Sequence, residues 1–338
     1  MTQYVTLEDA KHQPFWRRPV ALLFLMALAM PIAFNTWSAL LNNFVIEVAA
    51  FDGSDIGLLH TVREIPGFLA VGVIAIILFV REQVLGLVSL VLLGVATGSA
   101  ATLVAYLAIM GLWETLSLSY NIVYLIGGGV TAVIALVALV AYPQFEAPTP
   151  QIKKMVLRKR YWLYYALQFM SGARRQIFVV FAGFMMVERF GFDVHEITML
   201  YLINLIANMI FAPLMGRAVG FFGERRTLSF EYIGLILVFL AYGGVYYLGW
   251  GVVVAATLYV LDHMFFALAL ALKTYFQKIA DPADIAPTAA VAFTINHIAA
   301  VFLPVGLGLL WLVSPAAVFF LAAGMALVSL LLSLMIPR

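Results

Sequence analysis

The chain has 338 residues, of which 64% are hydrophobic and 11% are charged, and its formal net charge is +2. Soluble globular proteins are about half apolar and about a quarter charged, so this composition excludes a soluble enzyme and a disordered chain. The absence of cysteine excludes disulfides, thiolate metal sites and a cysteine nucleophile. The composition therefore predicts an all-α protein whose helices span a membrane.

Residues 1–19 are polar and end in Arg17, Arg18 and Pro19, which indicates a cytoplasmic flank before a start-transfer helix rather than a cleavable signal peptide. A membrane-spanning helix needs about 20 apolar residues. Ten windows of this kind follow, at 20–47, 57–80, 84–112, 120–142, 161–188, 196–216, 227–248, 251–275, 287–312 and 315–336.

Lysine and arginine favour one side of the membrane, which sets the orientation. With the N-terminus inside, the only basic residue in an external loop is Arg189. The cytoplasmic segments hold Lys11, Arg17, Arg18, Arg81, Lys153, Lys154, Arg158, Lys159, Arg160, Arg217, Arg225, Arg226, Lys278 and Arg338. We therefore expect both termini to be cytoplasmic in a multi-pass protein of the cell inner membrane.

The window 84–112 is ambiguous because it would form one helix about 44 Å long. It is one long tilted span, or two short spans broken near Gly98 and Ser99, or a span with a re-entrant half. Two full spans would place the basic stretch 153–160 outside, so one span and ten crossings are preferred.

Residues 143–160 form a proline-rich and then basic segment between four predicted spans and six. This pattern indicates a cytoplasmic linker between two helix bundles. The predicted organisation is a flank at 1–19, a bundle of about four spans at 20–142, the linker at 143–160, and a six-helix bundle at 161–338.

A short glycine- and arginine-rich segment follows the sixth span, where Gly216, Arg217, Gly223, Arg225 and Arg226 lie within eleven residues. It resembles the loop that joins the second and third spans of each six-span bundle in the major facilitator superfamily. The family's acidic residue and its following arginine are replaced by Gly220 and Phe221. In the first half, 80–83 does not match this pattern.

The resemblance implies a major facilitator fold of two helix bundles and transport of a solute by alternating access. That family has six spans in each half, whereas four are counted before the linker here. Two consecutive spans are therefore expected to be missing near 98–100, which would make the first bundle incomplete.

Charged and polar side chains inside spans are the candidate functional residues, because they are costly at membrane depth. Arg174 and Arg175 lie near the middle of the fifth span, and Asp262 and His263 near the middle of the eighth. The remaining candidates are Asn204 and Asn208, four residues apart in the sixth span, with Asn296 and His297 in the ninth.

The resemblance implies that the fifth and eighth spans line the solute path. In one interpretation, an arginine attracts an anionic solute while Asp262 and His263 exchange protons. In the other, an arginine forms a structural ion pair with Asp262. Two arginines face one aspartate in this scheme, so one positive charge would be available to a solute.

Two acidic residues receive structural interpretations. Glu64 is expected to pair with Arg63 at the external interface, and Glu231 to anchor the cytoplasmic end of the seventh span beside Arg225 and Arg226. No nucleotide-binding loop and no cluster with metal-ligand spacing are found, so no cofactor, metal or nucleic acid is expected.

The leading hypothesis is a monomeric, proton-coupled secondary transporter of a small, possibly anionic solute in the lipid bilayer. The alternative is a truncated or remodelled relative that does not transport. A membrane enzyme using His263 and His297 ranks last, because two isolated histidines are too few for a catalytic site.

Overall fold

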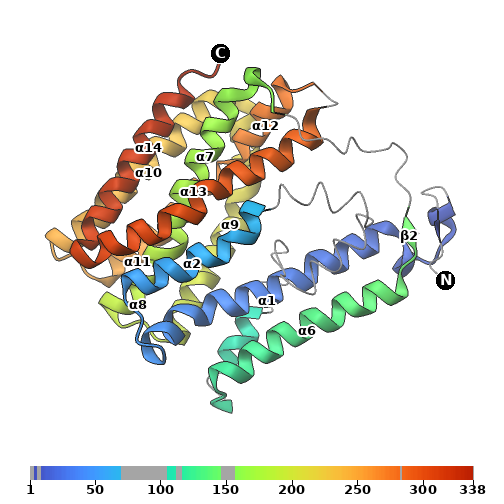
Figure 1. The fold of residues 1–338 in the computed structure, drawn as a ribbon, viewed down its shortest axis with the longest axis horizontal. Coiled ribbons are helices and arrows are strands. Elements are labelled where there is room, and N and C mark those ends of the chain that lie inside the picture. Colours follow the sequence, from blue (N-terminus) through green and yellow to red (C-terminus); the bar gives the residue numbers. More distant parts are fainter. Residues whose placement is uncertain are drawn as a thin grey trace. The chain divides into compact units, whose positions relative to one another are not determined.

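The computed structural model describes residues 4–5, 9–69, 105–111, 116–145, 157–281 and 284–337. Within these ranges the protein is all-helical apart from one pair of two-residue strands (Figure 1). The long helices are α1 (Pro19–Glu47), α2 (Gly53–Phe68), α6 (Tyr120–Ala141), α7 (Trp162–Gln176), α8 (Gly183–Phe190), α9 (Val194–Phe222), α10 (Glu224–Tyr247), α11 (Val252–Ala267), α12 (Leu270–Ile279), α13 (Ile285–Val313) and α14 (Pro315–Ser333).

The remaining elements are short. Single 3-10 turns lie at η1 (Asp9–His12), η2 (Phe15–Arg17) and η4 (Lys159–Tyr161), and η5 (Ile177–Ala182) is a π-helical segment that joins α7 to α8. The strands β1 (Tyr4–Val5) and β2 (Gln144–Phe145) pair in parallel.

Six described segments are long and apolar enough to cross a membrane. They are Tyr120–Ala141, Val194–Phe211, Glu224–Tyr247, Val252–Ile279, Thr288–Val313 and Pro315–Ser333. These agree with six of the predicted spans. Helix α2 covers the first half of the predicted window 57–80, and residues 70–80 lie outside the described residues. Most of the window 84–112 also lies outside them, and so does the question of whether it is one span or two.

Two predicted spans are less regular than expected. The predicted span at 161–188 is α7, η5 and α8 in succession, with a π-helical segment at its centre. The predicted span at 251–275 is two helices, because α11 ends at Ala267 and α12 begins at Leu270.

Local sequence fixes several helix ends. Asp52 caps α2 by accepting hydrogen bonds from the backbone N–H groups of Ser54 and Asp55, at 2.8 and 3.1 Å. Asp55 accepts in return from the Asp52 backbone at 3.2 Å, which completes a capping box. Ser314 caps α14, which begins with a proline as helix starts often do.

The chain divides into two compact units. The first contains α1 up to Phe44, α6, and the start of α9 up to Leu205. In it, Thr131 on α6 donates to the carbonyl oxygen of Ala29 on α1 at 2.8 Å. The second contains α2, α7, α8, α10 to α14 and the rest of α9.

In the second unit α13 packs along both α2 and α7, and α10 packs against α14 (Figure 1). Contact between α7 and α13 is close at Gly172, where a Cβ would lie 1.9 Å from the carbonyl oxygen of Asn296. Only glycine fits there. This packing places the polar residues of α2, α7 and α13 beside one another.

Candidate functional site

A buried charged cluster joins α7 and α10. Arg174 on α7 is 1% exposed, and its Nη1 lies 3.4 Å from Oε1 of Glu231, a fully buried residue on α10. The guanidinium carbon also lies 4.5 Å from the ring centre of Tyr232. An ion pair and a cation–π contact therefore hold Arg174 in place.

Asp262 on α11 belongs to the same region but does not contact the arginine. The charge of Arg174 acts on the Asp262 carboxyl group, yet no ion pair joins the two side chains. Asp262 Oδ2 is buried and has no hydrogen-bond partner among the described residues. The interpretation in which an arginine forms a structural ion pair with Asp262 is therefore wrong, because Arg174 pairs with Glu231 and Arg175 pairs with Glu64.

Arg174, Glu231 and Asp262 are termed the acidic cluster. It contains one arginine and two carboxyl groups, so it is electrically neutral only when one carboxyl group holds a proton. The prediction that Glu231 anchors the cytoplasmic end of the span is also wrong. Glu231 lies six residues beyond Arg225, about 9 Å further along α10, and this places it among buried side chains.

His263 follows Asp262 in sequence, but no hydrogen bond joins the two side chains. Its ring packs against Phe178 of η5, with 4.9 Å between the ring centroids. Its Nδ1 is buried without a hydrogen-bond partner among the described residues. A role for His263 as the proton-exchange partner of Asp262 stays a prediction.

A second cluster joins α2, α7 and α13 and consists of Arg63, Glu64, Arg175 and His297, termed the basic cluster. The predicted ion pair between Arg63 and Glu64 is present. Glu64 is nevertheless buried, and its Oε2 also lies 3.3 Å from Arg175 Nη2 and 3.4 Å from His297 Nε2. Both arginines of α7 thus have a carboxylate partner, contrary to the expectation that one charge is unpaired.

Sequence reasoning recognised Glu64 as a charge in a span but not as the centre of this cluster. Apart from Arg63, its partners Arg175 and His297 belong to helices that are more than 100 residues away in the chain. The only local signal was the acidic side chain within an apolar window.

The predicted asparagines have separate positions. Asn296 donates from Nδ2 to the carbonyl oxygen of Gln168 at 3.1 Å and so ties α13 to α7. Asn204 is buried and Asn208 half-buried on α9. They belong to different units, so a joint role for them stays a prediction.

The glycine- and arginine-rich segment forms a tighter connection than predicted. Helix α9 continues through Gly216 and Arg217 to Phe222, and α10 begins at Glu224. The connection is Gly223 alone, whose positive φ of 77° favours glycine. Arg225 and Arg226 therefore lie in the first turn of α10.

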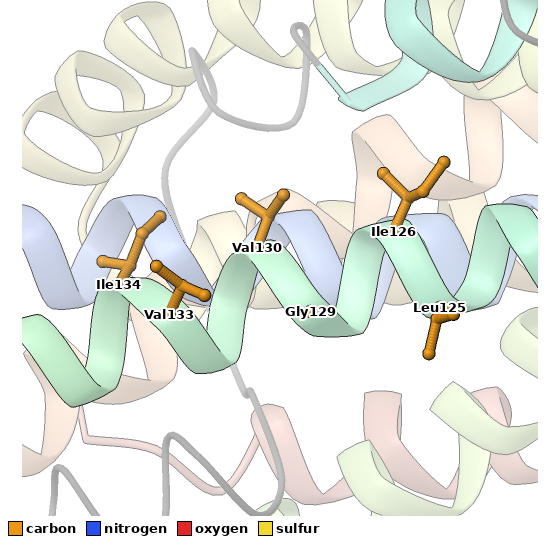
Figure 2. A pocket seen from close by; sticks show the side chains of 6 residues that line it. All are labelled: Leu125, Ile126, Gly129, Val130, Val133 and Ile134. Carbon is orange, nitrogen blue, oxygen red and sulfur yellow. The ribbon is translucent and has the colours of Figure 1, made fainter.

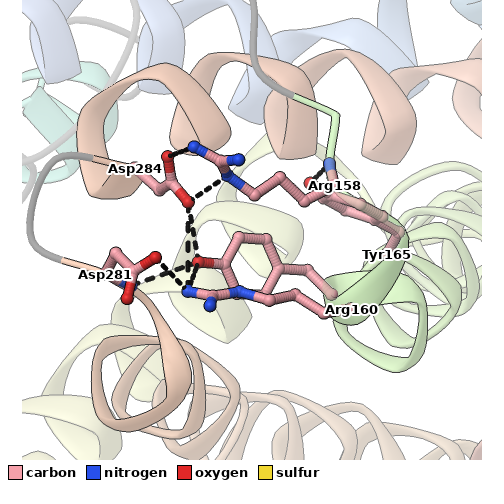
Figure 3. A network of polar contacts seen from close by, with 6 residues as sticks. Arg158, Arg160, Tyr165, Asp281 and Asp284 are labelled. Atoms are coloured by element: carbon pink, nitrogen blue, oxygen red, sulfur yellow. Dashed lines mark hydrogen bonds and ion pairs between the residues drawn. The ribbon is translucent and has the colours of Figure 1, made fainter.

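A third polar network lies at the start of α7 and α13 (Figure 3). Arg158 Nη2 donates to Asp284 Oδ1 at 2.8 Å, and the Tyr161 hydroxyl donates to Asp284 Oδ2 at 2.9 Å. Arg160 pairs with Asp281 at 2.6 Å. Arg158 and Arg160, which belong to the basic stretch predicted as linker, thus hold the starts of α7 and α13 together. In the sequence, the two aspartates before α13 were the feature that could have indicated this pairing.

The Arg158 hydrogen bond holds the pKa of the Asp284 carboxyl group below its ordinary value, and Tyr161 adds to this effect. A lowered pKa in the folded state stabilises the protein above the ordinary pKa, and this stabilisation is lost as the pH falls through the lowered value. The difference in melting temperature between the unmodified protein and Asp284→Asn should therefore shrink from about pH 6 to about pH 3. Thermal unfolding in detergent measures it.

Asp281→Asn is the matched control, because the Asp281 side chain is 58% exposed and its ion pair should contribute little. A difference between the unmodified protein and Asp284→Asn that is constant across this range would contradict the assignment.

Two hollows share no lining residue with either charged cluster. Among the described residues, one of about 450 Å³ is lined by α6 side chains, including Ile126, Val130 and Ile134 (Figure 2). The other, of about 670 Å³, is apolar except for Arg226 and Thr227 and lies among α9, α10 and α11. Their linings suit acyl chains better than a polar solute. Within the described ranges, no three His, Asp or Glu side chains gather as a metal site requires.

No protein-family model matches the sequence, and no curated protein matches it. Solved structures are similar in fold. The nucleoside transporter NupG has a TM-score of 0.68 and 13% identity, over 94% of this chain and 98% of that chain. A variant of peptide transporter POT has a TM-score of 0.64 and 13% identity, over 98% of this chain and 97% of that chain.

The human organic anion transporter MFSD10 has a TM-score of 0.56 and 14% identity, over 95% of this chain and 100% of that chain. These similar structures are transporters rather than enzymes. With helices long enough to cross a bilayer and this likeness over most of its length, the protein is a multi-pass helical membrane protein with the fold of major facilitator transporters.

Proposed function

We propose that the protein is a secondary active transporter that moves a small solute across the cell inner membrane by alternating access, coupled to protons. The observation that carries the proposal is the acidic cluster. Burying one arginine with two carboxyl groups is costly, and a protein retains such groups when a proton or ion is exchanged there. Asp262 is the candidate proton carrier, with His263 beside it.

The basic cluster supports an anionic solute. Its described members include two arginines and one carboxylate, and the Arg175 side chain is 29% exposed, so it can reach a solute while it contacts Glu64. The similar structures are those of a nucleoside transporter, a peptide transporter and an organic anion transporter. Organic anions are therefore the first class to test, followed by the other two.

Purified protein reconstituted into liposomes with an imposed pH gradient tests the proposal. Accumulation of a labelled solute from one of these classes is expected with the gradient, and none after an uncoupler collapses it. Protein-free liposomes provide the control. A protein that moves no solute and no protons under either direction of gradient would instead be a remodelled relative without transport activity.

That alternative rests on the count of four predicted spans before the linker at 143–160, where the fold family has six. The proposed organisation is a flank at 1–19, a bundle at 20–142 and a six-helix bundle at 161–338, ten spans in a monomer with both termini cytoplasmic.

Cysteine labelling tests this topology, because the chain has no cysteine of its own. Ala49→Cys, in the exposed turn between α1 and α2, should react with an impermeant thiol reagent from outside. Thr149→Cys, in the linker, should react with the same reagent only after the membrane is permeabilised. If both variants react from outside, the ten-span count is wrong.

A further inference from the structure

The ring of His297 lies between two oxygen atoms. Its Nδ1 is 2.8 Å from the carbonyl oxygen of Phe293, and its Nε2 is 3.4 Å from Glu64 Oε2. A carbonyl oxygen can only accept a hydrogen bond, so Nδ1 must carry hydrogen. A neutral imidazole has a single N–H, and its other nitrogen then directs a lone pair at Glu64.

This contact is favourable only when one more proton is present. On Nε2, the proton makes an imidazolium that donates to the Glu64 carboxylate; on Glu64, it makes a carboxylic acid that donates to Nε2. We propose that Glu64 and His297 form a proton-binding site shared by α2 and α13, in which one proton taken from water lies between Oε2 and Nε2.

Charged groups around the site affect proton binding in opposite directions. Arg175 Nη2 lies 3.3 Å from the same Glu64 oxygen that His297 approaches, so the two compete for it. Arg63 contacts the other carboxylate oxygen. Both arginines repel a protonated ring, whereas an ionised Glu64 attracts it.

Other titratable groups lie further from the contact. His60 lies one turn earlier on α2 and is buried. Arg174 precedes Arg175 on α7 but pairs with Glu231. The π-helical segment η5, which also packs on α2, has no titratable side chain.

The backbone of α2 is shaped to admit the ring. A Cβ on Gly67 would lie 2.1 Å from His297 Cδ2 and 2.5 Å from Nε2, so any side chain at this position would push the imidazole away from Glu64. The Arg63 and Arg175 side chains are 24% and 29% exposed, whereas that of Glu64 is 6% exposed.

This inference goes beyond the proposed function, because a proton-binding site at Glu64 and His297 exists whether or not the protein transports a solute. Its test uses the purified full-length protein in detergent and no transport assay. Isotope-labelled histidine allows the ring nitrogens to be followed by NMR, and His297→Gln identifies the His297 signals among the five histidines of the chain.

In the unmodified protein, we expect an Nδ1-protonated ring whose Nε2 signal moves in a one-proton titration. Glu64→Gln should abolish that titration or displace it to lower pH by about one unit or more, a tenfold loss of bound proton at a given pH. Arg175→Gln should displace it in the opposite direction. Glu188→Gln is the matched control, because Glu188 accepts from Trp311 instead and should leave it unchanged.

Gly67→Ala provides a second route to the same result. It changes no charge and moves the ring away from Glu64, so the titration should shift in the direction of Glu64→Gln. If Glu64→Gln does not fold, Gly67→Ala and Arg175→Gln together decide the matter. A neutral ring protonated on Nε2 and not on Nδ1, or a titration that these variants leave unchanged, would overturn the proposal.

Discussion

Arg174→Met is expected to destabilise the protein by about 3–5 kcal/mol, the usual cost of removing one partner from a buried ion pair. Methionine fills the same space but leaves Glu231 and Asp262 without a positive charge in an apolar interior. Loss of the contact with the Tyr232 ring adds to the effect. Unfolding of the protein in detergent, induced by heat or by a denaturant, measures the change in stability.

The neighbouring substitution Arg175→Met is the matched control and should cost less. Arg175 is 29% exposed, and its partner Glu64 keeps its contacts with Arg63 and His297. The double variant Arg174→Met with Glu231→Gln should recover much of the lost stability, because an uncharged amide then replaces the carboxylate that lost its partner. Recovery with Asp262→Asn in place of Glu231→Gln would show that Asp262 is the true partner.

Asp262→Asn is expected to abolish accumulation of solute driven by a pH gradient while sparing exchange of solute across the membrane. Asparagine has the shape of aspartate but cannot release a proton, and exchange needs no net proton movement. A gradient of about one pH unit supports about tenfold accumulation when one proton moves with each solute. The variant should reach only the external concentration in the liposome assay.

Glu188→Gln serves as the control for this experiment as well, since Glu188 lies on α8 and bonds to the Trp311 indole at 3.0 Å. It should accumulate solute like the unmodified protein. Undiminished accumulation by Asp262→Asn would remove Asp262 from the coupling mechanism and leave the Glu64 and His297 contact as the remaining candidate.

The membrane helices of the second half could be predicted because apolar length alone identifies them. The predicted spans at 196–216, 227–248, 287–312 and 315–336 each correspond to one of the helices α9, α10, α13 and α14. Their interruptions could not be predicted. No glycine or proline marks the break at Leu268 and Ala269, and every residue from Met264 to Leu272 is apolar.

The partners of the buried charges were harder to predict than their existence. Arg174, Asp262 and His297 were identified because a charge or imidazole in an apolar span is conspicuous. Their partners depend on how each helix is rotated about its axis. A helix that is apolar on every side has no polar stripe to reveal its inward face, so Glu231 could not be assigned to Arg174 from the sequence.

The π-helical segment at Ile177–Ala182 has a consequence for alignment and for mutagenesis. Its wide turn holds an extra residue that an α-helix would not contain, so α7 and α8 are offset by about 100° from a continuous helical wheel. Deleting one residue there would convert the segment to ordinary α-helix. The directions in which Arg174 before it and Glu188 after it point would be preserved. The same deletion in the middle of α10 would rotate one end against the other, so a one-residue length difference among related chains is best tolerated at this point.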